Sequence, residues 1–160
     1  MWMTKLILIL FAIFTITIQY NKYAYGEELE QNDLDCLSEA IYYEARGDTF
    51  MSQLAVGTVI MNRVRLNTFP NTICKVVHQG CQFSYYCDGL PEKMLDREAK
   101  KASYDLARFI LSGATVWRLR DATHYHAFYV NPYWANVFTL ISREGAHLFY
   151  SVKGRKQNAS

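Results

Sequence analysis

The hydrophobic and polar positions after residue 32 change period along the chain. Between positions 33 and 46, apolar residues recur at steps of three and four, which predicts an amphipathic helix capped by Asp33 or Asp35 and ended by Gly47. The run MSQLAVGTVIMNRV that follows predicts a second helix, largely buried and beginning within two residues of Gly47.

The regular period weakens after the Phe69-Pro70-Asn71 break. Residues 72–90 contain three cysteines and two glycines and are predicted to form a loop with short elements. Pro91 suits the first position of a third helix, which Ser112-Gly113 would end. The buried face expected for this helix consists of Leu95, Ala99, Ala102, Leu106, Phe109 and Ile110.

The remaining segments are rich in β-branched and aromatic residues. THYHAFYV (123–130) and GAHLFYSV (145–152) are predicted to be strands, and residues 134–142 a short helix or turn. Helices followed by strands indicate an α+β domain with a small antiparallel sheet.

Residues 1–26 have the layout of a secretory signal peptide. One lysine precedes the uncharged run LILILFAIFTITI, and small residues occupy positions 24 and 26, where a signal peptidase reads the chain. The run is shorter than the about 20 residues of a membrane span, so an uncleaved N-terminal anchor is the second interpretation. We expect residues 27–160 to be one domain with a flexible lead-in at 27–32, secreted or held in the periplasm or cell envelope. Membrane contact is expected only if the N-terminal segment stays uncleaved.

The charge balance limits the partners. The chain has 17 basic and 15 acidic residues, and the two become equal without Lys5 and Lys22. A balanced charge gives no broad attraction to nucleic acid, so no nucleic-acid partner is expected. We also expect a monomer that uses no cofactor.

All four cysteines, Cys36, Cys74, Cys81 and Cys87, follow the predicted signal. An even count in a small exported domain favours disulfides, and four cysteines allow three pairings among which the sequence does not choose. One disulfide or a metal site are the other interpretations. The spacing lacks the paired C-x2-C knuckles of structural zinc sites, so no metal is expected.

Two glutamates lie on the first predicted helix. At about 100° per residue, Glu44 projects from the apolar face with Leu37 and Ile41, whereas Glu39 projects from the far side. Glu39 is therefore expected to be solvated. Glu44 is expected to be partly desolvated near the C-terminal end of a helix, and both conditions raise the pKa of a carboxyl group.

A glutamic acid whose pKa is raised to about 6 keeps its proton near neutral pH and can deliver it to a leaving oxygen. A glycosidic general acid has this requirement. The other interpretation of Glu44 is a buried ion pair with Arg46 or Arg63.

Six blocks in the same order resemble the SleB-type cell-wall hydrolases, the family of the spore-cortex-lytic enzymes. They are LSEAIYYEARGD (37–48), QLAVGTVIMNRV (53–64), FPNTICKVVHQG (69–80), CQFSYYCDG (81–89), ATHYHAFYVNPYWA (122–135) and GAHLFY (145–150). The resemblance implies a lysozyme-like catalytic domain that cleaves peptidoglycan glycan strands between N-acetylmuramic acid and N-acetylglucosamine, often as a lytic transglycosylase.

The resemblance also implies one catalytic residue. Glu44 occupies the position of the glutamate proposed as catalytic acid in the family's E-A-R-G-E motif. Asp48 replaces the second glutamate of that motif and is interpreted as a helix cap. Glu144 stands where an apolar residue is more usual.

Residues outside the first helix are possible substrate contacts. Gln82 and Ser84 carry groups that hydrogen-bond sugars, and Phe83 is either a stacking surface or core. Asp88 is either a second acid that positions water or part of an Asp-Gly turn.

Two residues of the first predicted strand complete the expected substrate site. Tyr125 and His126 lie on opposite faces of the strand and either line a glycan groove or pack within the domain. His147 shows no distinguishing feature. Two other functions remain open from the residues: a zinc-dependent peptidoglycan amidase or peptidase using His124, His126 and His147, and a non-catalytic wall-binding protein.

Overall fold

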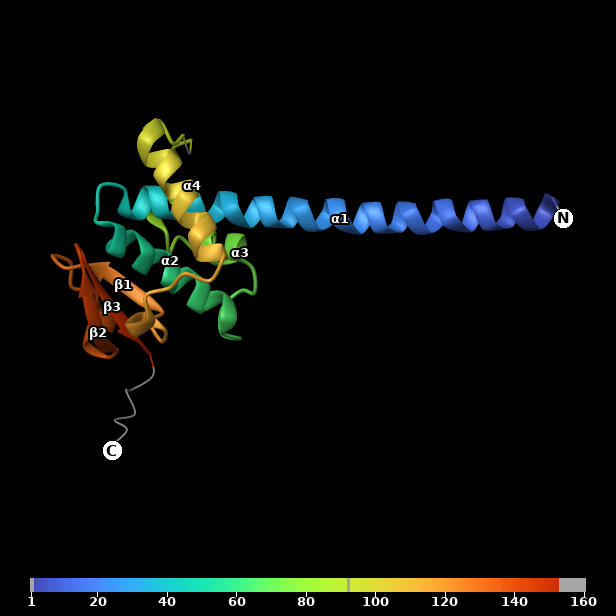
Figure 1. Ribbon diagram of the computed structural model, residues 1–160. Helices are drawn as coiled ribbons and strands as arrows, with labels where there is room; N and C mark the ends of the chain where they lie inside the picture. The colour runs from blue at the N-terminus through green and yellow to red at the C-terminus, as the bar shows by residue number, and fades with distance from the viewer. Residues whose placement is uncertain (1, 92, 153–160) are drawn as a thin grey trace. The chain divides into compact units, whose positions relative to one another are not determined.

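The computed structural model describes residues 2–91 and 93–152, and the chain divides into two compact units, Met1–Asn32 and Asp33–Ser160. Helix α1 (Trp2–Ala45) supplies the described residues of the first unit and continues into the second (Figure 1). Residues 27–32, expected to be a flexible lead-in, are helical. Asp33 and Asp35 lie inside α1, so the expected aspartate cap there is wrong. Among the described helices, none is long and apolar enough to cross a membrane.

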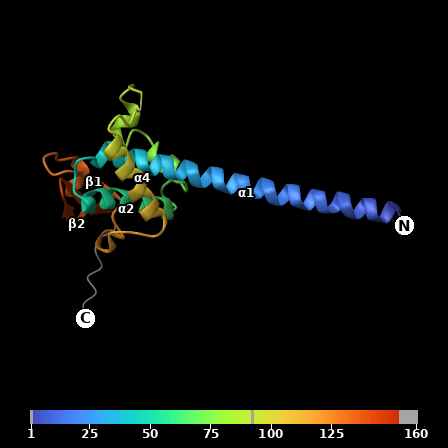
Figure 2. The same cartoon turned by 45° about the horizontal axis from the view of Figure 1, so that its top comes forward.

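Helix α2 (Phe50–Arg65) is the central element of the second unit, and most of its residues are buried. It packs against α3 (Ile73–Val77) and α4 (Arg97–Leu111) and also contacts the sheet, as can be followed in Figure 2. Gly57 lies where α2 meets α4, and a Cβ atom there would overlap Cδ1 of Ile110. A small residue at this position lets the two helices approach closely.

Helix α4 differs from its prediction in start and in face. It begins after Asp96, whose carboxylate accepts a hydrogen bond from the Ala99 amide at 3.0 Å, and not at Pro91. Leu95 and Phe109 are 80% and 52% exposed, contrary to expectation. The buried face consists of Ser103, Leu106, Ala107 and Ile110. Ser103 and Ala107 belong to this stripe but not to the predicted face, which also included the exposed Ala102.

Three strands form an antiparallel sheet in the order β1-β3-β2. They are β1 (His124–Ala127), β2 (Thr139–Glu144) and β3 (His147–Ser151). Residues 134–142 were expected to be a helix or turn, yet they contain most of the short helix η3 (Tyr133–Asn136) and the start of β2. The register shifts between Leu140 and Ser142, which breaks the period of two that would have identified this strand.

Two disulfides close the structure, as predicted. Cys36–Cys74 joins α1 to α3, and Cys81–Cys87 closes the loop that carries the short helix η1 (Ser84–Cys87). A further short helix, η2 (Trp117–Leu119), precedes β1. The α+β architecture with a small antiparallel sheet is confirmed.

Candidate active site

Glu44 is the penultimate residue of α1, and its side chain is half-buried. Leu37, Ala40 and Ile41 on the same helix face are fully buried, as the helical period predicted. Glu39 is also half-buried and is less solvated than expected. The geometry therefore sets Glu44 at the edge of the core, where a carboxyl group is neither fully hydrated nor enclosed.

Tyr125 of β1 reaches Glu44 from the sheet. Its hydroxyl donates a hydrogen bond to Oε2 of Glu44 at 3.1 Å. Its ring packs against Phe149 and His147 of β3, with ring centres 5.5 and 5.3 Å apart. The contact joins the end of α1 to the face of the sheet that packs on the helices.

Arg63 of α2 is a buried cation near these two residues. Its Nε donates to the carbonyl oxygen of Thr123 at 2.8 Å, and its guanidinium lies over the ring of Phe83, 5.7 Å from the centre. Among the described side chains, no arginine lies within 4 Å of the Glu44 carboxylate. Arg46 instead covers the ring of Tyr42 at 4.7 Å. A direct ion pair is thus not what holds Glu44 in place.

Burial raises the pKa of Glu44 above its usual value, while the Tyr125 hydrogen bond and the positive charge of Arg63 partly lower it. The same burial lowers the pKa of Arg63, although the nearby Tyr125 and Glu44 counteract this effect. The direction expected for Glu44 from its helical position is confirmed. A carboxyl group in this environment can hold a proton at a higher pH than an exposed one.

The loop closed by Cys81–Cys87 alternates buried and exposed residues. Phe83 is 1% exposed, so it belongs to the core, which is one of its two expected roles. Tyr85 is buried and stacks on Tyr43 of α1, with ring centres 4.5 Å apart. Gln82 and Ser84 are exposed between them. The buried pair anchors the loop, and the polar pair is open to solvent.

Asp88 lies in an exposed turn. Its Oδ1 accepts a hydrogen bond from the Leu90 amide at 2.8 Å, and Gly89 takes a φ of 76°. This is the local bonding of an Asp-Gly turn, the alternative role expected for Asp88.

His126 lies on the sheet face opposite to Tyr125. Its Nε2 is 3.0 Å from the Tyr150 hydroxyl, and its ring packs edge-on against Trp134. The structure therefore brings Tyr125, but not His126, to Glu44. His147 pairs with Ala127 and shares the face of Tyr125, away from that of His126. The three histidines of the zinc alternative thus project from two faces.

Asp48 and His147 contact each other beside the site, a contact that the sequence did not indicate. The Asp48 carboxylate does not cap α2, because Thr49 does so by accepting from the Ser52 amide at 3.3 Å. Instead its Oδ2 accepts from the Ser52 hydroxyl at 2.9 Å and lies 3.3 Å from Nδ1 of His147. That nitrogen is buried, and its contact with Asp48 does not meet the geometry of a hydrogen bond. Only knowledge of how the strands pair would have revealed it.

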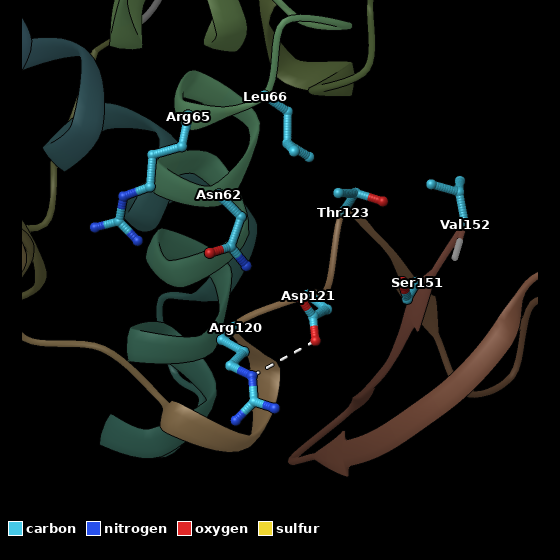
Figure 3. Close-up of a pocket in the computed structure, with 8 residues that line it drawn as sticks. All are labelled: Asn62, Arg65, Leu66, Arg120, Asp121, Thr123, Ser151 and Val152. Carbon is cyan, nitrogen blue, oxygen red and sulfur yellow. Dashed lines mark ion pairs between the residues drawn. The ribbon is translucent and has the colours of Figure 1, made fainter. Parts of the chain in front are cut away.

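A separate cavity of about 110 Å³ lies beside the C-terminal end of α2 (Figure 3). Its walls include two arginines, but Figure 3 shows their guanidinium groups pointing in different directions. Arg120 is 3.6 Å from Asp121, which offsets its charge. Neither Glu44 nor Tyr125 lines this cavity. Its residues are Asn62, Arg65, Leu66, Arg120, Asp121, Thr123, Ser151 and Val152.

A helical core, a small antiparallel sheet and a half-buried glutamate at a helix end define a lysozyme-like domain. The chain belongs to the Cell Wall Hydrolase family, whose model matches residues 47–150. Glu44 precedes the first matched residue by three positions.

Solved structures and curated relatives agree with this assignment. The chain resembles the catalytic domain of the germination-specific lytic transglycosylase SleB from Bacillus anthracis, with 31% identity, a TM-score of 0.62, and coverage of 76% of this chain and 95% of that one. The catalytic domain of the Bacillus cereus SleB protein gives 30% identity and a TM-score of 0.61, with coverage of 76% and 91%.

A spore cortex-lytic enzyme of Bacillus cereus is 32% identical over 124 residues, which are 74% of this chain and 44% of the relative. The chain thus spans less than half the length of this curated relative.

Proposed function

We propose that this chain cleaves peptidoglycan glycan strands between N-acetylmuramic acid and N-acetylglucosamine as a lytic transglycosylase, with Glu44 as acid and then base. The observation that carries the proposal is the setting of Glu44. It is half-buried at a helix end, its pKa is raised by burial, and one of its oxygens is held by Tyr125. Similarity to a SleB catalytic domain described as a lytic transglycosylase supports the reaction class.

The first step is protonation of the bridging oxygen. Protonated Glu44 gives its proton to the oxygen between the sugars, the glycosidic bond breaks, and the departing N-acetylglucosamine takes the bonding electron pair. The muramic ring acquires oxocarbenium character, which its N-acetyl carbonyl can stabilise. This assistance removes the need for a second protein carboxylate.

The second step closes a ring. Glu44, now a carboxylate, takes the proton of the muramic 6-hydroxyl while that oxygen bonds to the anomeric carbon. The product is a 1,6-anhydro sugar, and Glu44 ends the cycle protonated as it began. Water in place of the 6-hydroxyl would give a reducing end and a muramidase.

Polar side chains on the disulfide-closed loop are suited to contact the substrate. Gln82 and Ser84 are exposed, while Phe83 contacts Arg63 and Tyr85 contacts Tyr43 beneath them. We assign the two polar residues to sugar binding. Asp88 and His126 are left out, because their hydrogen bonds are used in a turn and on the other sheet face.

We further propose that residues 1–26 direct export or anchor the chain, that residues 27–160 form the working domain, and that the protein acts as a monomer at the cell wall. Peptidoglycan is found outside the inner membrane, so the proposed substrate requires export. Mass spectrometry of the exported protein tests the boundary, because cleavage gives a mature N-terminus near Glu27.

The deciding experiment digests purified peptidoglycan with the oxidised protein and with its Glu44→Gln variant, followed by mass spectrometry of the soluble fragments. Fragments one water lighter than reducing muropeptides, absent with the variant, are expected. Reducing ends would replace the transglycosylase with a muramidase. Cleaved peptides on intact glycans, or full activity of Glu44→Gln, would overturn the mechanism, and binding without cleavage would indicate a wall-binding protein.

A further inference from the structure

We propose that Asp48 and His147 position Tyr125 against Glu44, so that Tyr125 holds one carboxyl oxygen and leaves the other to carry the transferred proton. The inference rests on the proposed function and deepens it, because it assigns a role to three residues around Glu44. Tyr125 and His147 come from β1 and β3, and Asp48 from the turn between α1 and α2.

Tyr125 is suited to hold a carboxylate through a hydrogen bond. Burial, first, and the nearby Glu44 charge raise the pKa of Tyr125 well above its usual value, so its hydroxyl keeps its proton. The hydroxyl is then a permanent donor to Oε2 of Glu44 at 3.1 Å. A carboxyl group has two oxygens, and a donor on Oε2 favours Oε1 as the site of the acid proton.

His147 supports the Tyr125 ring from the side. The two rings meet edge-on at 86°, with centres 5.3 Å apart. Tyr125 pairs with Phe149 and Ala127 with His147, so Tyr125 and His147 are diagonal neighbours on one sheet face. His147 is 9% exposed and has little room to move.

Asp48 holds His147 from the helical side. Its Oδ2 is 3.3 Å from Nδ1 of His147 and accepts from the Ser52 hydroxyl at 2.9 Å. The Ser52 hydroxyl also contacts the carbonyl oxygen of Glu144, at 3.2 Å. These contacts require the β2–β3 turn to lie close to α2.

Gly145 permits that close approach. Its φ is +56°, and a Cβ atom there would lie 2.9 Å from the Ser52 hydroxyl oxygen. The turn, Ser52 and Asp48 therefore form one packed unit that fixes His147 and, through it, Tyr125.

The groups that affect Glu44 come from different elements. Tyr125 of β1 and Arg63 of α2 both lower its pKa, against the larger effect of burial. Burial, first, and His126 lower the pKa of His147, against the opposing effect of Asp48. Because the Tyr125 hydrogen bond stabilises the carboxylate form of Glu44, its removal raises the pKa of Glu44 further.

The experiment measures the pH dependence of fragment release from peptidoglycan by the full chain and its Tyr125→Phe variant. Glu44 must be protonated to act, so activity falls on the alkaline side as Glu44 ionises. Loss of the hydroxyl is expected to move this alkaline limb upward by about one pH unit, the equivalent of one charged hydrogen bond. The apparent kcat should fall while KM changes little.

The matched control is Tyr104→Phe. The Tyr104 hydroxyl donates to Oδ1 of Asp35 at 2.9 Å, which is the same kind of bond between α4 and α1. This variant loses a comparable hydrogen bond that does not involve Glu44, so the alkaline limb of its pH profile is expected to stay in place. An equal shift in Tyr104→Phe would mean general loosening and would overturn the proposal.

The second pair of variants tests the support behind Tyr125 and stays informative even if Tyr125→Phe fails to fold. Asp48→Asn removes the negative charge facing His147, and Asp48→Glu keeps it. We expect Asp48→Asn to shift the alkaline limb of the pH profile in the same direction as Tyr125→Phe, and Asp48→Glu to keep that limb at the wild-type position. Identical pH profiles for Asp48→Asn and Asp48→Glu would remove Asp48 and His147 from the assignment.

The outcomes separate this inference from the proposed function. If Glu44→Gln is inactive but Tyr125→Phe and Asp48→Asn keep the wild-type pH profile, the positioning role is wrong and the catalytic role of Glu44 survives. If Glu44→Gln retains activity, the proposed function itself fails.

Discussion

The hydroxyl of Tyr125 donates to Oε2 of Glu44 at 3.1 Å across 81 positions of sequence. The bond links the end of the first helix to the first strand, the two segments that contain the EARGD and THYHAFYV motifs. It opposes the effect of burial on Glu44 and leaves the pKa of that carboxyl group raised. The end of the first helix, the first strand and the titrating carboxyl group therefore meet at the Oε2 atom of Glu44.

Stability should depend on pH through Glu44. Its pKa in the folded state is raised above the usual 4.5, so the unfolded chain ionises first as the pH rises. Stability is lost between the unfolded and folded pKa values, by about 1.4 kcal/mol for each unit that separates them. Glu44→Gln abolishes this loss, so the free energy of unfolding of the variant should rise relative to that of the wild type between pH 4 and pH 7. Urea denaturation at several pH values checks this, and a constant difference would contradict it.

The packing of α2 on α4 predicts that the effect of one substitution on stability changes in the background of a second. Gly57→Ala should lower the free energy of unfolding by about 1 kcal/mol, because the overlap with Cδ1 of Ile110 outweighs the better helix propensity of alanine. Ile110→Val deletes that carbon. In its background Gly57→Ala should become neutral or stabilising, and the double-mutant cycle measures this coupling. Additive effects would show that the overlap is relieved elsewhere.

The sequence predicted Glu44 because its signal is local. The helical period places it among Leu37 and Ile41, and the structure keeps it there. The alternation along β1 correctly separated Tyr125 from His126 but did not tell which one faces the helices. That choice depends on β3 and on the packing of the sheet, which lie far away in sequence.

The role of His147 is still harder to predict. It follows from strand register, from the Asp48 side chain and from the close approach at Gly145, none of which leaves a pattern in a single segment. The strand β2 was missed for a related reason, because its register shift conceals the alternation. Local periods therefore give the helices and the acid, whereas long-range contacts decide what surrounds the acid.

Loss of each of the two disulfides is expected to lower stability and activity in different proportions. In the chain-entropy model, loss of Cys36–Cys74, with a separation of 38, costs about 4 kcal/mol, and loss of Cys81–Cys87, with a separation of 6, about 2 kcal/mol. The shorter loop carries Gln82 and Ser84, so its serine double variant should lose more activity for each kcal/mol of stability lost. Thermal unfolding and fragment release, measured on both double variants, check this. Activity that simply follows stability would contradict it.

The ion pair between Glu144 and Arg118 explains how a carboxylate is accommodated in a buried position of the sheet. Arg118 donates through Nε and Nη2 to the two carboxylate oxygens at 2.6 Å each, and Ser142 adds a bond at 2.7 Å. The Glu144 side chain is 7% exposed, so it depends on these donors. The Arg118 hydrogen bond, first, holds the pKa of Glu144 below its usual value despite burial.

Arg118→Met should therefore destabilise the protein at pH 7, because it leaves a buried carboxylate without its main donor. Since the folded pKa of Glu144 is lowered, the stability from this pair is present above the unfolded pKa and is lost as the pH falls through the folded pKa. The difference in the free energy of unfolding between Arg118→Met and the wild type should thus become smaller at acidic pH. Lys101→Met is the control, since it breaks an exposed pair with Asp105 and should change little at either pH. A difference for Arg118→Met that persists in acid would show that packing of the arginine stem, and not its charge, stabilises this end of the sheet.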